Sequence, residues 1–278
     1  MFGDGQINFD DPGAHHDLGI GINMLRSLGY WMQATKLARF TGVPKGEGIP
    51  FELTDIGKIT LKFDPYLEDI GTLWLLQYEL ASNKDLAPLW YWVFNLMRTR
   101  EFTEASLSQG FTRFLAEENL PKYAKETVTR DIRCFKRTYS PSTRAERTGY
   151  HEDLMDCPLA ELSLIRESAT PGNYSLHIGS HNGLPPLVFA YAVLRYRETN
   201  AQDQAAISLD DLRWAAGSPG RVFCLDSGNT LDILETLERE TDLVRVTRSE
   251  GISQITISQI SATQVLERYF RRSEKNAI

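Results

Sequence analysis

Apolar residues recur at helical spacing along most of the chain. In residues 22–37, for example, Ile22, Leu25 and Met32 fall on one face of a helix. The same spacing predicts further helices, at residues 70–83, 86–97, 103–120, 127–137, 153–166, 185–197, 208–215 and 229–241. The pattern therefore predicts a mainly α protein.

Two regions follow the two-residue period of a strand instead. Residues 49–53 form a candidate strand directly after a glycine-rich stretch. Residues 243–247 and 253–257 alternate apolar and polar positions around Gly251, which predicts a β-hairpin. A helix followed by a glycine-containing hairpin is typical of a winged helix. We therefore expect an α+β fold built from winged-helix-like helical modules with small β-hairpins.

The polar segment 141–150 is the best candidate for a linker between two domains. It separates an N-terminal domain, residues 18–140, from a C-terminal domain, residues 151–278. Residues 1–17 contain glycine, aspartate and proline with little periodicity, and we expect them to be flexible.

The composition is that of an ordinary globular protein. Of 278 residues, 42% are hydrophobic, 10% aromatic and 24% charged, which excludes collagen-like and wholly disordered chains. The three cysteines are odd in number and far apart, which argues against a disulfide framework. The N-terminus has no basic region followed by an apolar core, and no apolar stretch is long enough to span a membrane. These features predict a cytoplasmic protein.

Charge is unevenly distributed along the chain. Residues 121–150 carry eight basic and three acidic side chains, a net +5, whereas the whole chain has a formal net charge of −7. Within this segment Val128, Ile132 and Phe135 predict one apolar helix face, and threonine and arginine occupy much of the rest. The helix 127–137 is either a recognition helix that binds nucleic acid or a basic face in contact with solvent.

Carboxylates gather in two places. Asp64, Glu68 and Asp69 bracket one turn, and Asp156 and Glu161 belong to a second acidic cluster. Phosphodiester cleavage commonly uses carboxylates that converge on Mg²⁺, which activates water. Taken alone, Asp64 and Asp69 are better explained as helix caps, which the helix dipole favours.

Other chemistry finds less support in the sequence. No phosphate-binding Walker loop and no nucleophile elbow occur. His177 and His181 with Cys134 and Cys157 are conceivable zinc ligands, but no Cys-x-x-Cys pair is present.

Two aromatic features leave alternatives open. Four of the five tryptophans lie between Trp31 and Trp92, as in a core of packed helices or, alternatively, a base-stacking platform. The hydroxyl of Tyr66 or Tyr139 is a conceivable covalent nucleophile.

Eight segments in a fixed order resemble the bacterial domain-of-unknown-function family 4007, over nearly the whole chain. One is DPYLEDIGTLWLL, from Asp64 to Leu76. The complete set comprises residues 18–27, 30–31, 51–57, 64–76, 90–95, 130–139, 156–162 and 217–223. Members of the family sit beside sulfur-transfer genes, and the family looks like the nickase component of the single-stranded DNA phosphorothioation defence system.

The resemblance implies a DNA-binding protein that cuts one strand and gives the sulfur machinery access to the backbone. DNA, a sulfur-transfer enzyme and an ATPase are the implied partners. Under this reading we assign phosphate binding to the basic residues Arg26, Lys36, Arg39, Arg130, Arg133, Lys136 and Arg137. We assign a divalent-metal site to Asp64, Glu68 and Asp69, with Asp131, Asp156 and Glu161 as further catalytic candidates. The alternatives are a non-catalytic DNA-binding adaptor that recruits the sulfur-transfer enzymes, and a transcriptional regulator.

Overall fold

The computed structural model describes residues 14–42, 51–140, 156–181, 183–202, 204, 206–249 and 252–276. Its helices are α1 (Ala14–Asp17), α2 (Ile22–Ala34), α3 (Asp55–Phe63), α4 (Ile70–Ala81), α5 (Pro88–Tyr91), the π-helix η1 (Trp92–Leu96), α6 (Glu104–Glu117), α7 (Lys125–Tyr139), the 3₁₀ helix η4 (Pro158–Leu162), α8 (Pro186–Asn200), α9 (Leu209–Trp214), α10 (Pro219–Val222), α11 (Ser227–Glu240) and α12 (Ala262–Asn276). Its strands are β1 (Ala38–Phe40), β2 (Phe51–Leu53), β3 (Glu101–Phe102), β4 (Ile165–Glu167), β5 (Tyr174–Leu176), β6 (Ile207–Ser208), β7 (Val244–Ser249) and β8 (Ile252–Ile257). Helices predominate and the sheets are small, which confirms the mainly α, α+β prediction.

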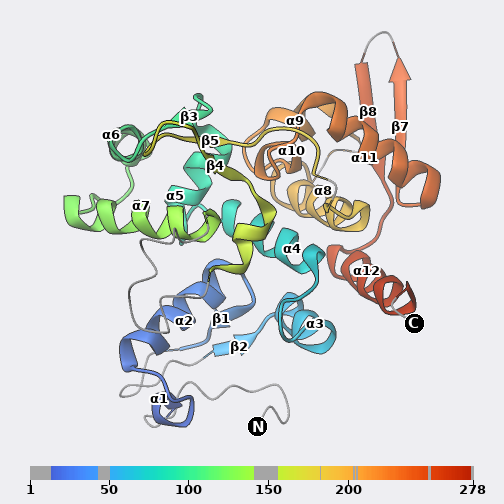
Figure 1. The fold of residues 1–278 in the computed structure, drawn as a ribbon. Helices are drawn as coiled ribbons and strands as arrows, with labels where there is room; N and C mark the ends of the chain where they lie inside the picture. Colours follow the sequence, from blue (N-terminus) through green and yellow to red (C-terminus); the bar gives the residue numbers. More distant parts are fainter. Residues whose placement is uncertain are drawn as a thin grey trace.

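Helix α4 lies at the centre of the molecule, between the elements that precede and follow it (Figure 1). Every residue from Gly71 to Ala81 is buried, as expected of a helix that is apolar on most of its circumference. It contacts α5, η4, α8 and α10, and one continuous hydrophobic core extends from Ala34 to Phe270. The two predicted domains therefore share a core, while the predicted linker, residues 141–150, lies outside the described residues, as do residues 1–13.

The N-terminal part is a helix followed by an antiparallel pair of strands. Strand β1 pairs with β2, with Arg39 opposite Glu52, and α3 follows with Thr54 as its N-cap. Gly57 of α3 lies so close to the chain that a Cβ atom would meet the Leu37 carbonyl oxygen at 1.9 Å. Only glycine fits there, because the side chain of any other residue would push α3 away from β1.

In the middle of the chain, α6 and α7 pack against each other, and α7 meets the sheet β3–β5–β4 through Phe135 and Lys136. Phe102 of β3 stacks on Tyr174 of β5, and both side chains lie on the face of the sheet that is turned toward α7. Trp90 is buried against Phe135 of α7, and Trp74 is buried against His181 and Phe223. Their rings support the helical-core interpretation of the tryptophans, because a buried ring has no face free for a base.

The C-terminal part has the element order α8, β6, α9, α10, α11, β7, β8. Its sheet is antiparallel with strand order β6–β8–β7, and the predicted hairpin is present as β7–β8, which projects from the body in Figure 1. The winged-helix identity expected from this order of helices and strands stays a prediction. Helix α12 then packs on α8 and α3, tying the C-terminus to the N-terminal part.

Several predicted elements differ from the structure. The helix predicted over residues 153–166 is wrong where it is described, because Pro158–Leu162 form only a 3₁₀ turn and Ile165–Glu167 form a strand. Ser163 adopts a left-handed φ of 52°, which ends the turn, and β4 then pairs with β5. The helix at residues 22–37 ends at Ala34, and α3 and α12 were not predicted at all.

Candidate nucleic-acid interface

Helix α7 contains the predicted recognition segment, and the structure confirms that this segment is helical. Val128, Ile132, Phe135 and Tyr139 are buried along one face. Phe135 packs edge-on against Trp90 and also contacts the ring of Tyr139. The helix is therefore anchored by the apolar stripe that its sequence pattern predicted.

The opposite face of α7 carries exposed arginines. Arg130, Arg133 and Arg137 are spaced by three and four residues, so they follow one side of the helix. Within the described part of the chain, no ion pair is recorded for any of the three. Arg130 lies close enough to the half-buried Asp131 to oppose the effect of burial, which raises the pKa of that carboxyl. The face is cationic and accessible.

Lys136 points elsewhere. Its ammonium group binds Glu104 of α6 at 2.5 Å and lies 4.7 Å from the centre of the Tyr174 ring. These contacts hold α7 to α6 and β5, so Lys136 belongs to the scaffold of the interface in this structure. Its assignment to phosphate binding stays a prediction that the geometry does not favour.

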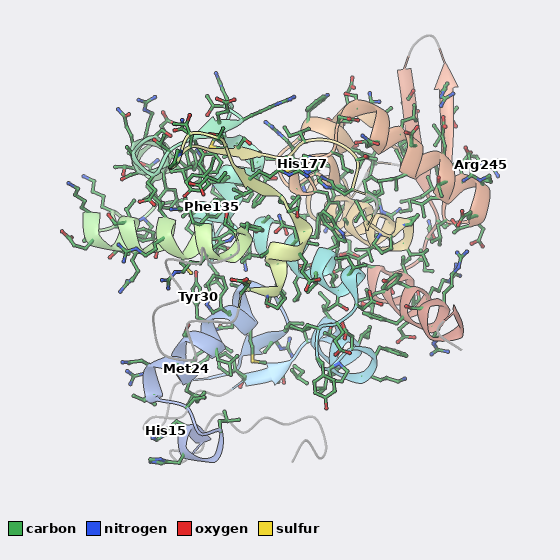
Figure 2. All side chains as sticks on the ribbon, in the orientation of Figure 1. His15, Met24, Tyr30, Phe135, His177 and Arg245 are labelled. Carbon is green, nitrogen blue, oxygen red and sulfur yellow. The ribbon has the colours of Figure 1, made fainter. Side chains whose placement is uncertain are left out.

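Helix α2 borders α7 on the side of Asp131, below α7 in Figure 2. The Tyr30 hydroxyl donates to the Leu86 carbonyl oxygen, and burial followed by the nearby Asp131 charge raises the pKa of Tyr30 to about 12. Arg26 is exposed and lies one helical turn before Tyr30, so it shares the face of α2 that adjoins α7. Arg26 is thus an exposed cation on a helix that borders α7, and we call Arg26, Arg130, Arg133 and Arg137 the arginine face.

The other two N-terminal basic residues have acidic partners. The Lys36 ammonium lies 2.7 Å from the carboxylate of Glu79, which is fully buried on α4, and Arg39 pairs with Glu52 across the β1–β2 ribbon. Glu79 also accepts a hydrogen bond from Tyr191 at 2.5 Å and contacts Arg195. Glu79 was not predicted from the sequence, because its partner Lys36 is distant in sequence and the local pattern of an apolar helix does not reveal the ion pair.

The carboxylates of the predicted metal site hold the corner between α3 and α4. Asp64 is 7% exposed, and its two oxygens accept the backbone N–H groups of Glu68 at 2.9 Å and Asp69 at 3.1 Å. Asp69 caps α4 by accepting the Gly71 N–H at 2.7 Å. Only Glu68 is exposed and has no recorded side-chain partner in the described residues.

Asp69 is further engaged by the C-terminal helix. The Tyr269 hydroxyl donates to its Oδ1 at 2.5 Å and the Ser273 hydroxyl to its Oδ2 at 3.2 Å. Burial, and then the bond to Asp69, raises the pKa of Tyr269. As arranged here, Asp64 and Asp69 serve as structural hydrogen-bond acceptors, and their assignment to a metal site stays a prediction.

The remaining carboxylate candidates lie elsewhere. Asp131 is half-buried on α7, while Asp156 and Glu161 are exposed at η4, which contacts α7. Among the described residues, no group of three histidine, cysteine, aspartate or glutamate side chains is arranged to hold a metal ion. The structure thus places Asp131 on α7 and Glu161 on η4, which contacts both α7 and α4. Their catalytic role stays a prediction.

The conceivable zinc ligands form two pairs and are not gathered into one metal-binding group among the described residues. The rings of His177 and His181 lie 5.2 Å apart, and His181 packs on Trp74, whereas Cys134 and Cys157 belong to α7 and the start of η4. Tyr139 is buried and donates to Gln77 at 2.5 Å, and burial raises its pKa, which makes it a poor nucleophile.

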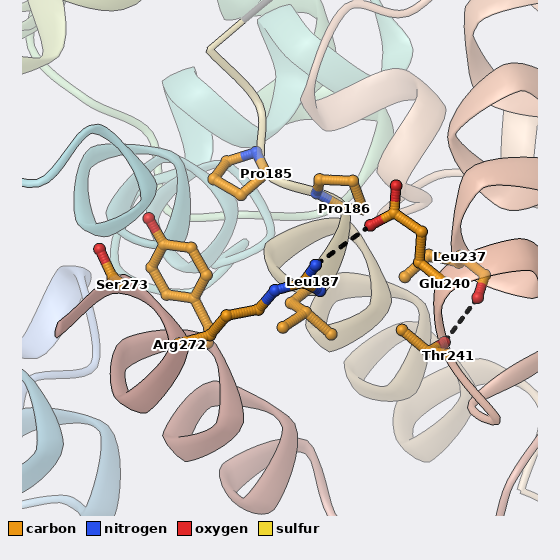
Figure 3. A pocket seen from close by; sticks show the side chains of 9 residues that line it. Pro185, Pro186, Leu187, Leu237, Glu240, Thr241, Arg272 and Ser273 are labelled. Atoms are coloured by element: carbon orange, nitrogen blue, oxygen red, sulfur yellow. Dashed lines mark hydrogen bonds and ion pairs between the residues drawn. The ribbon is translucent and has the colours of Figure 1, made fainter. Parts of the chain in front are cut away.

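A pocket of about 340 Å³ lies between the start of α8 and the ends of α11 and α12 (Figure 3). Arg272 there pairs with Glu240 at 3.5 Å, so its main cation is neutralised. The pocket lies away from the arginine face. Within the described residues, no helix combines the length and apolar character needed to cross a bilayer.

Comparisons with known proteins agree on the relatives of this chain. The model of the family DUF4007, a protein of unknown function, matches residues 3–270. An SspB crystal structure has a TM-score of 0.83 and 28% identity, covering 95% of this chain and 80% of that chain. A magnesium ion-bound SspB crystal structure has a TM-score of 0.82 with the same identity and coverage. No curated protein matches the chain.

Proposed function

This chain belongs to the DUF4007 family, and on this basis we propose that it is the DNA-binding component of a DNA phosphorothioation defence system. We further propose that it cuts one DNA strand, which gives the sulfur-transfer enzymes access to the backbone. Its similarity to SspB over 95% of the chain supports a place in such a system. The cut and the DNA contact are our own proposals.

The observation that carries the DNA contact is the arginine face. Its three α7 members lie between Arg130 and Arg137, which are seven residue steps and roughly 10 Å apart along the helix at 1.5 Å per residue. Successive phosphates of one strand rise about 3.4 Å along the duplex, so this length reaches several of them. Guanidinium groups bind phosphate oxygens in a bidentate manner. Within the described residues these arginines form no recorded ion pair that would have to break before they bind phosphate.

The cut would be a hydrolysis in which water attacks phosphorus and one P–O ester bond breaks. Glu68 is the member of the predicted metal site that is open to solvent, whereas Asp64 and Asp69 already accept hydrogen bonds. Mg²⁺ dependence is therefore a separate proposal, and we derive no catalytic step from it.

A supercoiled-plasmid assay tests both proposals. The wild type is incubated with and without Mg²⁺ beside Glu68→Gln, Asp64→Asn and the control Glu117→Gln, an exposed carboxylate at the end of α6. Open circles that need Mg²⁺ and disappear only in the first two variants would support a nickase centred on this corner. Nicking by all four proteins would support the nickase activity but would show that its catalytic site lies elsewhere in the chain.

A non-catalytic adaptor is the second candidate. The observation in its favour is that Asp64 and Asp69 serve as hydrogen-bond acceptors at the α3–α4 corner and toward α12. An adaptor would shift DNA in a gel without producing open circles at any Mg²⁺ concentration. That combination would replace the nickase proposal and leave the arginine face in place.

A further inference from the structure

Helix α11 occupies the place that a recognition helix takes in a winged helix. It follows α9 and α10, precedes the β7–β8 hairpin, and contacts α8, α9 and β7. Thr230, Leu234 and Leu237 are buried on its inner side. Its outer side is therefore the surface that the module presents.

This outer surface is acidic. Along α11 itself, four carboxylates outnumber one arginine, namely Asp232, Glu235, Glu238 and Glu240 against Arg239. Glu240 pairs with Arg239 and with Arg272 of α12, whereas no ion pair is recorded for Asp232 or Glu238 in the described residues. Glu235 also pairs with Arg248 of β7, which neutralises a cation of the hairpin. A surface of this sign repels a phosphate backbone, so the module is unsuited to bind DNA through α11.

An exposed tryptophan adjoins the acidic surface. Trp214 ends α9 with 52% of its surface exposed. Asp210 and Asp211 precede it by four and three residues, so they lie on the same side of α9. The Arg213 guanidinium donates to the Ser227 carbonyl oxygen at 2.7 Å, which fixes the end of α9 against the start of α11.

A large exposed ring beside carboxylates is unusual for a surface that meets only water. Tryptophan is strongly enriched among residues that dominate protein–protein binding, because its ring fills a pocket at low entropic cost. Within the described residues, no ion pair is recorded for Asp211 or Asp232, so both charges are open to a partner.

We propose that Trp214, Asp210, Asp211 and Asp232 form a docking surface for a partner protein that presents lysine and arginine side chains around an apolar socket. Charge complementarity selects this occupant over nucleic acid. In Figure 1, α9 and α11 lie on the opposite side of α4 from α7, so a partner and DNA can bind together. The inference rests on the proposed function only for the choice of probe proteins.

The test measures binding of the full chain to the purified sulfur-transfer enzyme and ATPase of the same system, by titration calorimetry at several salt concentrations. Trp214→Ala should weaken one of these complexes by about tenfold or more. Asp211→Lys with Asp232→Lys should weaken it further and remove its salt dependence. Tyr66→Ala is the matched control, because Tyr66 is an aromatic residue with 82% exposure on another surface.

DNA binding by the same samples separates this inference from the proposed function. Trp214→Ala and Trp214→Phe should bind DNA like the wild type, which also shows that both are folded. Equal partner affinity for wild type and Trp214→Ala would overturn the docking surface. So would a failure of the wild type to bind either the sulfur-transfer enzyme or the ATPase. Self-association that Trp214→Ala abolishes would overturn the choice of occupant, because the surface would then bind a second copy of the chain.

Discussion

Helices α7 and α11 occupy comparable positions in the two halves of the molecule and present opposite charges. Each follows another helix, each is 14 or 15 residues long, and each buries one apolar face. The outer face of α7 carries Arg130, Arg133 and Arg137, whereas that of α11 carries Asp232 and its acidic neighbours. Similar local architecture therefore serves two different kinds of surface.

The comparison shows why the whole-chain charge is a poor guide to partners. A net charge of −7 suggests a protein that avoids nucleic acid. The charge is divided between surfaces on opposite sides of the core, and a ligand responds to the local field. It follows that a winged-helix-like arrangement does not by itself make α11 a DNA reader, because function depends on the side chains of the site.

The largest effect is expected at the core that lies between α7 and α11, where the buried Glu79 binds Lys36 and Arg195. Glu79→Gln removes a buried charge that binds Lys36 and contacts Arg195. We expect a loss of about 3 kcal/mol in unfolding free energy, because the two cations lose their shared partner. Urea denaturation measures it, with Glu52→Gln as a surface control. A loss below 1 kcal/mol would show that the halves are held by apolar packing alone.

A smaller effect is expected at the corner between α3 and α4. Asp69→Ala removes the cap of α4 and the acceptor of the Tyr269 and Ser273 hydroxyls. We expect a destabilisation of about 1–2 kcal/mol in thermal unfolding. If the variant instead keeps wild-type stability and loses only nicking, the residue is catalytic and our structural assignment is wrong.

Local patterns accounted for most helices but not for their partners. The stripe Val128, Ile132 and Phe135 predicted α7 correctly, because helical periodicity depends only on neighbouring residues. Strand β4 was predicted as helix, since its pairing with β5 depends on residues about ten positions away. Helix α12 follows the hairpin and was overlooked despite its amphipathic pattern.

The candidate site was predictable in part for the same reason. Arg130, Arg133 and Arg137 follow from the helix pattern alone, and the structure leaves them exposed. Lys36 carries the same charge, yet its partner Glu79 is 43 residues away in sequence and becomes a neighbour only in the folded chain. The capping role of Asp69 was foreseen, while its bonds to α12 were not.

The free energy of unfolding should depend weakly on pH through His181, which packs on Trp74. The Trp74 ring packs against both His181 and Phe223. Burial lowers the pKa of His181. Because the unfolded chain binds this proton more readily, stability should fall as pH drops below about 6.5. His181→Gln should flatten the decline between pH 7.5 and 5.0 by up to about 1 kcal/mol in urea titrations. An unchanged slope would show that His181 titrates alike in both states.

The smallest effect is expected from α11 itself. Asp232→Lys reverses one charge on the acidic surface, which we place away from bound DNA. DNA affinity and its salt dependence should therefore stay within about twofold of wild type, since no phosphate comes near the new lysine. A marked gain in affinity, with a steeper salt slope in fluorescence anisotropy, would place α11 beside DNA and remove the contrast with α7.

The most direct test of the central claim is the salt dependence of DNA binding by the Arg133→Ala, Arg137→Ala double variant. Its matched control is Arg268→Ala with Arg271→Ala, two α12 arginines that already pair with Asp242 and Glu267. If both α7 arginines bind phosphates, the negative slope of log K against log salt should become shallower by about 1.8, for every DNA sequence alike. The control should retain the wild-type slope. Equal slopes for wild type and the α7 variant would contradict the assignment of α7 as the DNA interface.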